Sequence, residues 1–204
     1  MQEINGRTAI EAHLNRLYKG AAGYILEDVK KDPAQAGNPL EDILIFKHQT
    51  DPVHWHYITF GLTELYDKET QFEDISGFGF ELTFRLLANP KDKQPPSWAK
   101  HFLQNIARYV FESGEGFDDY HFMDAGGVIC QDEPTDLTAI AFITDAELSE
   151  ISTSNGKVKF LQVIGITQEE MKEVEGENYM EFFNRLQKGN PLLITDLKRK
   201  SIAR

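Results

Sequence analysis

The sequence predicts an α+β fold in which a mixed or antiparallel β-sheet packs against helices. Two segments, residues 54–62 and 76–86, alternate between faces with the period of a β-strand, and other segments repeat apolar residues with the period of a helix. The two kinds of segment do not follow each other as regular βαβ units. With 204 residues and 41% hydrophobic content, the chain is large enough to bury the core of one domain.

The first expected element is a helix near the amino terminus, because Thr8 and Glu11 have the spacing of a capping box. Apolar residues at helical spacing accompany it, namely Ile10, Leu14, Leu17 and Tyr18. Two glycines are expected to end it, namely Gly20 and Gly23. Residues 30–40 have the prolines and glycine of a linker. We therefore expect residues 1–37 to form a helix and linker, packed on the domain or peripheral to it, and residues 38–204 to form the domain.

Residues 43–47 predict a short strand, and HWHYITFGL, from residue 54, predicts the next one. One face of this second strand carries His54, His56, Ile58 and Phe60, and the other carries Trp55, Tyr57 and Thr59. Two imidazoles on one face are fewer ligands than a zinc site requires, and the only cysteine is Cys130. We expect packed or hydrogen-bonded histidines and no metal site.

SGFGFELTFRL, residues 76–86, predicts a half-buried strand. Its apolar face carries Phe78, Phe80, Leu82, Phe84 and Leu86. Its other face carries Gly77, Gly79, Glu81, Thr83 and Arg85. The two glycines indicate that another backbone or side chain approaches closely. We expect the polar residues to form a solvated stripe, with a recognition strip beside a partner as the alternative.

Ser97 is expected to cap a helix that continues to about Glu112, where Gly114 and Gly116 follow. Its apolar stripe includes Trp98, Phe102, Leu103, Ile106, Tyr109 and Val110. Later strands are expected at residues 121–129, 137–144 and 158–166.

Residues 148–153 are expected to pair in a hairpin across Ser154-Asn155-Gly156, since Asn-Gly favours that turn. Thr167 to Glu170 forms another capping box, which begins a helix interrupted at Gly176. Residues 192–195 predict a last strand.

Composition narrows the classes of partner. Twenty-one basic and 33 acidic residues give a formal net charge of −12, which repels nucleic acid phosphates and anionic membranes. Such a surface serves solubility or favours a basic protein partner. One cysteine cannot form an internal disulfide, and there is neither a signal-peptide pattern nor a membrane-spanning apolar run. We expect a cytoplasmic protein with no nucleic acid or membrane partner.

Catalysis is disfavoured. Cys130 has His121 and Asp132 nearby in sequence, but nothing marks an activated nucleophile, and an inert buried thiol is the simpler interpretation. The acidic residues from Asp67 to Asp74 are interpreted as a charged connection. The alternative to a binding protein is a small metal-dependent hydrolase that uses the histidines at positions 54 and 56. No cofactor is expected.

Five segments resemble the amino-terminal domain of the Suppressor of fused family in the same order: HWHYITFGLTELYD, SGFGFELTFRL, ARYVFESGEGF, FLQVIGIT and PLLITDLKR, covering about residues 38–200. In eukaryotic members a second domain follows, and the pair clamps an extended peptide of a Gli transcription factor, which adds as a strand. This chain ends at Arg204, so it is similar to single-domain prokaryotic-type members, some of which are associated with immunity to secreted toxins. The resemblance implies a non-enzymatic protein-binding fold with an immunity-type or regulatory role.

The candidate site is the segment 109–120, which leaves a helix through two glycines and carries four carboxylates. Such a loop is suited to a basic or amide-rich peptide, and an ordinary solvated loop is the alternative. The family's peptide-contacting tyrosine corresponds to Tyr109, and the phenylalanine of the next loop to Phe117. The family's aspartate corresponds to Asp118 or Asp119, of which we favour Asp119. We expect these four residues to contact a protein or peptide partner.

Overall fold

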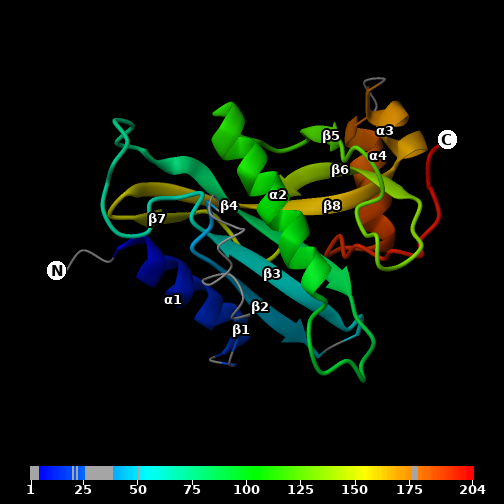
Figure 1. Ribbon diagram of the computed structural model, residues 1–204, viewed down its shortest axis with the longest axis horizontal. Coiled ribbons are helices and arrows are strands. Elements are labelled where there is room, and N and C mark those ends of the chain that lie inside the picture. The colour runs from blue at the N-terminus through cyan, green and yellow to red at the C-terminus, as the bar shows by residue number, and fades with distance from the viewer. Residues whose placement is uncertain (1–4, 20, 22, 26–38, 50, 176–178) are drawn as a thin grey trace.

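The computed structural model in Figure 1 describes residues 5–19, 21, 23–25, 39–49, 51–175 and 179–204. Its helices are α1 (Gly6–Tyr18), α2 (Ser97–Ser113), α3 (Gln168–Glu173) and α4 (Tyr179–Gly189). Its strands are β1 (Tyr24–Ile25), β2 (Asp42–His48), β3 (His54–Phe60), β4 (Ile75–Leu87), β5 (Phe122–Asp124), β6 (Leu137–Thr144), β7 (Ile151–Thr153) and β8 (Gly156–Thr167). The predicted α+β fold is confirmed.

The described strands form one eight-stranded mixed sheet in the order β1-β2-β3-β4-β8-β6-β5, with β7 paired to β8. All neighbouring strands are antiparallel except β4 and β8, which run parallel at the centre of the sheet. This pair joins an antiparallel unit built from the first half of the chain to a second antiparallel unit built from the other half. Strand β5 forms one outer edge of the sheet.

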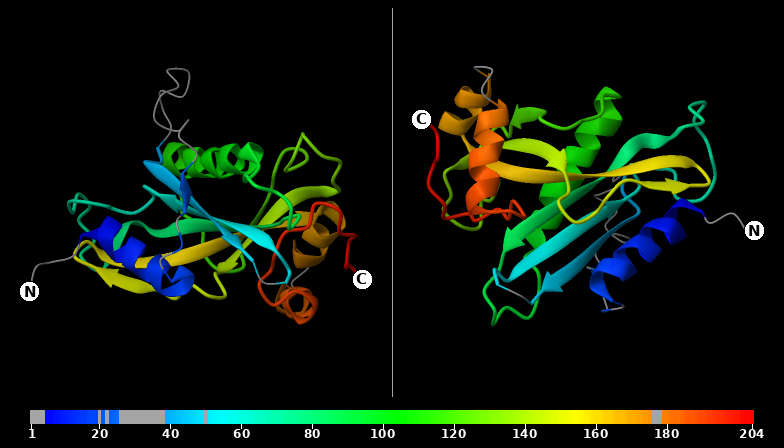
Figure 2. Two further views of the ribbon diagram at one scale, coloured as in Figure 1. Left: turned by 90° about the horizontal axis from the view of Figure 1, so that it is seen from below. Right: turned by 180° about the vertical axis from the view of Figure 1, so that it is seen from behind.

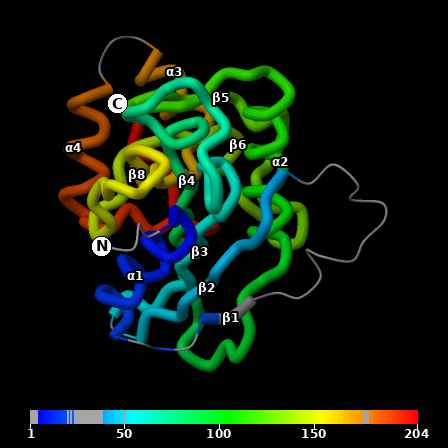
Figure 3. Tube along the Cα trace, turned by 90° about the vertical axis from the view of Figure 1, so that its left-hand side faces the viewer, coloured from blue at the N-terminus to red at the C-terminus, as the bar shows by residue number. Residues whose placement is uncertain are grey.

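Helices cover both faces of the sheet. Figure 2 shows α2 on one face and α1 and α4 on the other, and the view in Figure 3 places them on the same two sides. Because both faces are covered, every residue of β3 is buried, and so is most of β4. The half-buried character predicted for residues 76–86 is therefore wrong.

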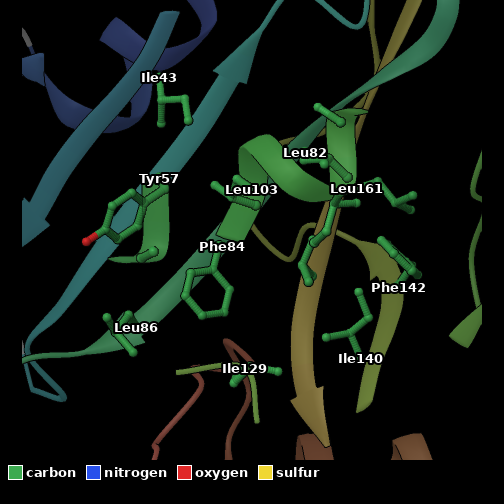
Figure 4. Packing of buried hydrophobic residues seen from close by; sticks show 14 of the residues in the cluster. Ile43, Tyr57, Leu82, Phe84, Leu86, Leu103, Ile129, Ile140, Phe142 and Leu161 are labelled. Carbon is green, nitrogen blue, oxygen red and sulfur yellow. The ribbon is translucent and has the colours of Figure 1, made fainter. Parts of the chain in front are cut away.

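The largest hydrophobic cluster lies between α2 and the sheet (Figure 4). Strand β4 contributes Phe80, Leu82, Phe84 and Leu86, so the apolar face predicted for this strand is confirmed. Helix α2 contributes Leu103 and Val110 to the same cluster. Burial of this apolar surface, at about 25 cal/mol per Å², stabilises the packing of α2 on the sheet.

Two smaller clusters lie on the opposite face. Ile10 and Leu14 of α1 pack with Phe46, Ile58, Phe60, Val158 and Phe160. Further along the sheet, Phe182, Phe183 and Leu186 of α4 pack against β6 and β8. The amino-terminal helix thus covers part of the sheet and contributes to its core.

Helix starts differ from two sequence expectations. Helix α1 begins one turn early, because the side chain of Asn5 accepts a hydrogen bond from the backbone N–H of Thr8, and Glu11 pairs with Arg7 instead of closing a capping box. Helix α2 has Pro96 at its N-cap with no side-chain cap, so Ser97 is its first residue. The capping box at Thr167 and the αL glycine after α2, Gly114, are present.

Three of the predicted strands are shorter in the structure. Strand β5 is only three residues long, since Tyr120 before it and Gly126 after it adopt positive φ and turn the chain. Residues 192–195 form only an isolated bridge, Leu86 to Thr195. The strand β6 is as predicted, and the predicted hairpin is present, but β7 covers only Ile151–Thr153 instead of residues 148–153. The expectations for Gly20, for most of residues 30–40 and for Gly176 fall outside the described residues.

The glycines of β4 do permit a close approach. Gly77 has φ 54°, and a Cβ placed there would lie 2.7 Å from the carbonyl oxygen of Leu62. The segment after β3 therefore lies directly against the start of β4, in a position that a larger residue would block.

Candidate partner-binding site

The structure brings the four candidate residues together at the end of α2. Tyr109 is 43% exposed, so it belongs to the surface rather than to the core. Its ring stacks on Phe117 with centroids 5.9 Å apart, and Phe117 stacks on Phe142 of β6 at 4.0 Å. Phe117 is thus an intermediate layer between the core and the exposed tyrosine.

The two aspartates share one lysine. The ammonium of Lys159 lies 2.6 Å from Asp118 and 2.9 Å from Asp119, and this lysine holds the pKa of Asp118 below its usual range. Burial alone would raise the pKa of Asp119, but Lys159 and two hydrogen bonds from Thr144 outweigh it and lower that pKa. The aspartates therefore fasten the loop to β6 and β8 and carry less free negative charge than expected.

Two hollows flank this residue set. A groove of about 720 Å³ runs along α2 beside β5 and the loop that follows it, and a smaller hollow of about 320 Å³ lies at the start of β5. Tyr109 lines both of them. Met123 of β5 lines the groove and Phe122 lines the smaller hollow, so the edge strand separates the two.

Strand β5 presents an unpaired edge. Its register with β6 pairs Met123 with Ile140, and the flanking bonds run from Ala125 N–H to Thr138 O and from Phe142 N–H to His121 O. In an antiparallel ladder the bonded residues alternate. The backbone groups of Phe122 and Asp124 therefore point away from β6, and no strand among the described residues pairs with them.

Several residues of the groove were not predicted from sequence. They include His101, Asn105, Met123, Val128 and Gln131. His101, Asn105 and Tyr109 follow each other at intervals of four on α2, so they share one helix face. That spacing was the available signal. Nothing in the sequence marked the loop residues, because their position depends on the short β5.

The two histidines that suggested metal chemistry lie elsewhere, under α1. His54 and His56 are fully buried, and burial lowers their pKa values to about 3 and about 4. Nδ1 of His54 donates to the carbonyl of Pro52 at 2.8 Å, and Nδ1 of His56 lies 2.5 Å from the hydroxyl of Tyr18. The expectation of packed and hydrogen-bonded histidines is confirmed.

Asp145, in the turn after β6, is the centre of this buried network. Its carboxylate lies 2.9 Å from Arg85, 3.2 Å from Nε2 of His56 and 2.8 Å from the hydroxyl of Thr83. Burial would raise the pKa of Asp145, but His56 and Arg85 lower it far below its usual range. Arg85 also pairs with Glu147 at 2.9 Å.

A second buried carboxylate organises the turn after β3. Glu81 accepts hydrogen bonds from the hydroxyls of Thr59 and Thr63 and from the backbone N–H groups of Gly61 and Thr63. Burial raises its pKa despite these bonds. The polar face of β4 was expected to be solvated, and this is wrong: Glu81, Thr83 and Arg85 are fully buried.

The described residues contain no group of three or more His, Cys, Asp or Glu side chains arranged to hold a metal ion. No helix among them has the length and apolar character needed to cross a membrane. Cys130 is buried, as expected.

Comparison with protein families gives a match over most of the chain. The family model for Suppressor of fused protein (SUFU) matches residues 37–200. The human Suppressor of fused homolog is 35% identical over 162 residues, which cover 72% of this chain and 32% of the human protein. The mouse homolog is 32% identical over 181 residues, which cover 79% and 36%. The chain thus spans about a third of the length of these relatives.

Solved structures share the fold. A chain of the Sufu–Fu complex superposes with a TM-score of 0.87 at 27% identity, covering 98% of this chain and 92% of that chain. Drosophila Suppressor of Fused gives a TM-score of 0.83 at 28% identity and covers 98% and 51%. A SUFU homologue from Neisseria gonorrhoeae gives 0.63 at 15% identity, covering 96% of each chain, and supports the fold alone.

Proposed function

This chain belongs to the Suppressor of fused family, and we propose that it is a non-enzymatic binding protein that captures an extended segment of a protein partner along the edge of β5. The observation that carries this proposal is the unpaired β5 edge between two hollows that share Tyr109. One solved relative is a complex between Sufu and Fu, which supports a protein partner in general terms.

The geometry suits strand addition. An added strand would hydrogen-bond to the outward backbone groups of Phe122 and Asp124. Its side chains would then alternate between the two sides of the sheet, and those on the α2 side would enter the groove beside Tyr109. Phe117 supports Tyr109 from below, while Asp118 and Asp119 fix the loop that holds Phe117.

Charge favours a basic or amide-rich segment. Glu112 and Glu115 are exposed at the end of α2, next to the smaller hollow, and neither forms an ion pair with another described residue. Carboxylates at the rim of an interface steer positively charged partners. Capture of a protein segment is compatible with two roles. In a regulatory role the captured protein is held inactive, and in an immunity-type role a toxin surface is occluded.

Catalysis by the histidine pair has little structural support. His54 and His56 are enclosed beneath α1 and their ring nitrogens contact Pro52, Tyr18, Arg85 and Asp145. A hydrolase would need a path for substrate to these rings. Metal analysis of the purified protein tests the alternative, since stoichiometric zinc held by both histidines would contradict a purely binding role.

The test begins with a pull-down from the native host, followed by affinity measurements on the captured partner. Asp124→Pro removes an outward-facing N–H without touching the β6 ladder, so it should abolish strand addition. Asp124→Ala is its matched control and should bind normally. Tyr109→Ala should weaken binding about tenfold while the thermal unfolding midpoint stays unchanged.

The proposal fails if Asp124→Pro binds as tightly as Asp124→Ala, because backbone pairing at this edge would then be irrelevant. Co-expression with the partner separates the two roles. Rescue of growth from a toxic partner would indicate immunity, whereas a non-toxic partner whose activity is suppressed would indicate regulation.

A further inference from the structure

A second groove, of about 630 Å³, lies beyond the carboxyl end of α2 and shares no lining residue with the hollows beside β5. It is formed by the segment after β3, the start of β4 and the last turn of α2. We call it the aromatic groove and define it by Tyr66, Phe72, Phe78 and Phe111. Nothing in the proposed capture of a strand at β5 uses this surface.

The aromatic groove exposes large apolar side chains. Phe72 is 70% exposed, Tyr66 51% and Phe111 44%. Phe78 and Phe111 meet edge to face at 5.0 Å, so one wall is a packed aromatic pair rather than a loose side chain. Concentrated aromatic exposure of this kind marks interaction sites, whereas single exposed apolar residues do not.

The rim of the aromatic groove is acidic. The segment from Leu62 to Asp74 contains five acidic residues and one lysine. That lysine, Lys68, is already engaged with Glu64 at 3.0 Å. Asp67 and Glu69 both line the groove, and neither pairs with a cation among the described residues. An incoming positive charge would therefore meet carboxylates that are not already neutralised.

The loop that carries these residues is held in place before any partner arrives. Burial would raise the pKa of Glu64, but backbone N–H donors at Thr70, Glu69 and Gly77 together with Lys68 lower it to about 2. The amide of Asn155, in the β7–β8 turn, donates to the carbonyls of Glu64 and Tyr66 at 2.8 and 3.2 Å. A loop fixed in this way loses little entropy on binding.

We propose that the aromatic groove is a second docking site, which takes a short basic segment of a partner protein with one large apolar side chain as its anchor. The anchor would pack among Phe72, Phe78 and Phe111, and lysine or arginine side chains beside it would meet Asp67 and Glu69. A second copy of this chain fits poorly, because each copy carries a formal net charge of −12 and would bring like charge to an acidic rim.

The probe is a fluorescein-labelled peptide, Lys-Arg-Phe-Leu-Lys-Arg, compared by fluorescence polarisation with its charge-reversed form, Glu-Asp-Phe-Leu-Glu-Asp. Only the basic peptide should bind. Phe72→Ala should weaken it about tenfold, as expected for loss of an exposed aromatic anchor. The double variant Asp67→Asn/Glu69→Gln should weaken it about fivefold at low salt and less at high salt.

Two variants serve as matched controls. Met180→Ala removes an exposed apolar side chain of α4, and Glu133→Gln/Glu175→Gln removes two exposed carboxylates, all outside the groove. Both should bind the basic peptide like the unaltered protein. If the control double variant loses as much affinity for the basic peptide as Asp67→Asn/Glu69→Gln does, the peptide is attracted to the acidic protein in general. That result would overturn the proposal.

The remaining outcomes are also decisive. Failure of both peptides to bind would overturn the proposal. A dimer that is seen in sedimentation and is lost in Phe72→Ala would also overturn it, because a second copy of the chain would then occupy the groove. Capture of a partner at β5 should be unaffected by Phe72→Ala. If the unaltered protein captures a partner at β5 but binds neither peptide, only the second docking site fails. If the basic peptide binds through Phe72 but Asp124→Pro leaves partner capture intact, only the strand-addition proposal fails.

Discussion

The two faces of β3 and β4 use their side chains in opposite ways. Toward α1, the strands present Ile58 and Phe60 but also four fully buried polar residues that are held by hydrogen bonds and ion pairs, namely His54, His56, Glu81 and Arg85. Toward α2, they present apolar residues, and the layer they build ends at the surface in two aromatic-lined hollows and a groove.

The difference separates the buried titratable residues from the exposed residues that we propose to contact a partner. The polar face holds titratable groups that are enclosed and largely paired with one another. The exposed side of the molecule offers aromatic rings, fixed loops and an unpaired strand edge. In this fold, buried charge supports the scaffold, and the surfaces that we propose for recognition lie apart from it.

The largest effect is expected for Asp145→Ala, which removes the centre of the buried polar network. Removing the carboxylate leaves buried Arg85 with only Glu147 as an ion-pair partner and removes the contact to Nε2 of His56, and we expect a loss of about 3–5 kcal/mol in the free energy of unfolding. Urea denaturation measures it. Asp136→Ala is the control, because its pair with Lys200 is exposed and should contribute less than about 1 kcal/mol. Equal losses of unfolding free energy in the two variants would mean that the buried network stabilises the fold no more than an exposed ion pair does.

The next effect is a loss of stability in mild acid. The pKa of His56 is lowered to about 4 in the folded protein, so the unfolded chain binds its proton first as the pH falls below about 6.5. Between pH 7 and pH 5 this one residue should cost about 2 kcal/mol of unfolding free energy. His54, lowered to about 3, acts in the same direction, whereas the raised pKa of Glu81 acts in the opposite one.

The control for this pH dependence is His56→Gln, measured by urea denaturation at both pH values. It should be less stable at pH 7, since it loses native contacts, but the change between pH 7 and pH 5 should be smaller. An unchanged pH dependence would mean that His56 does not carry it.

The smallest effect lies on the recognition side and compares the two aspartates that share Lys159. Asp119→Asn should cost about 1 kcal/mol, because Asp119 also accepts two hydrogen bonds from Thr144. Asp118→Asn should cost less than about 0.5 kcal/mol, since its side chain is 65% exposed. Thermal unfolding of both variants checks the order, and the reverse order would show that the loop is fixed through Asp118 instead.

Much of the fold followed from local pattern. Strict alternation gave β3 and β4, and the apolar stripe gave α2, because such periodicities are imposed by the elements themselves. The fate of Glu81 and Arg85 did not follow. A polar strand face predicts exposure to solvent. In the structure this face is enclosed by α1 and by Asp145, which lies 60 residues after Arg85 in the sequence.

For the candidate site, too, some features could be predicted from the sequence and others could not. Resemblance to a family selected Tyr109 and Phe117, and the structure places them in contact beside the β5 edge. Their role in binding stays a prediction. The pairing of Asp119 with Lys159 was beyond sequence reasoning, because it joins residues 40 apart across three strands of a sheet whose order was unknown.

The parallel pairing of β4 with β8 has a consequence for how the chain reaches this fold. It aligns Phe80 with Lys159, so the two halves of the sheet close only after a loop of nearly 80 residues. Closing such a long loop slows folding, and during synthesis the edge of β4 that pairs with β8 stays unpaired until β8 has been made. We expect its alternating Glu81, Thr83 and Arg85 to limit aggregation at that stage, before they become buried in the finished sheet.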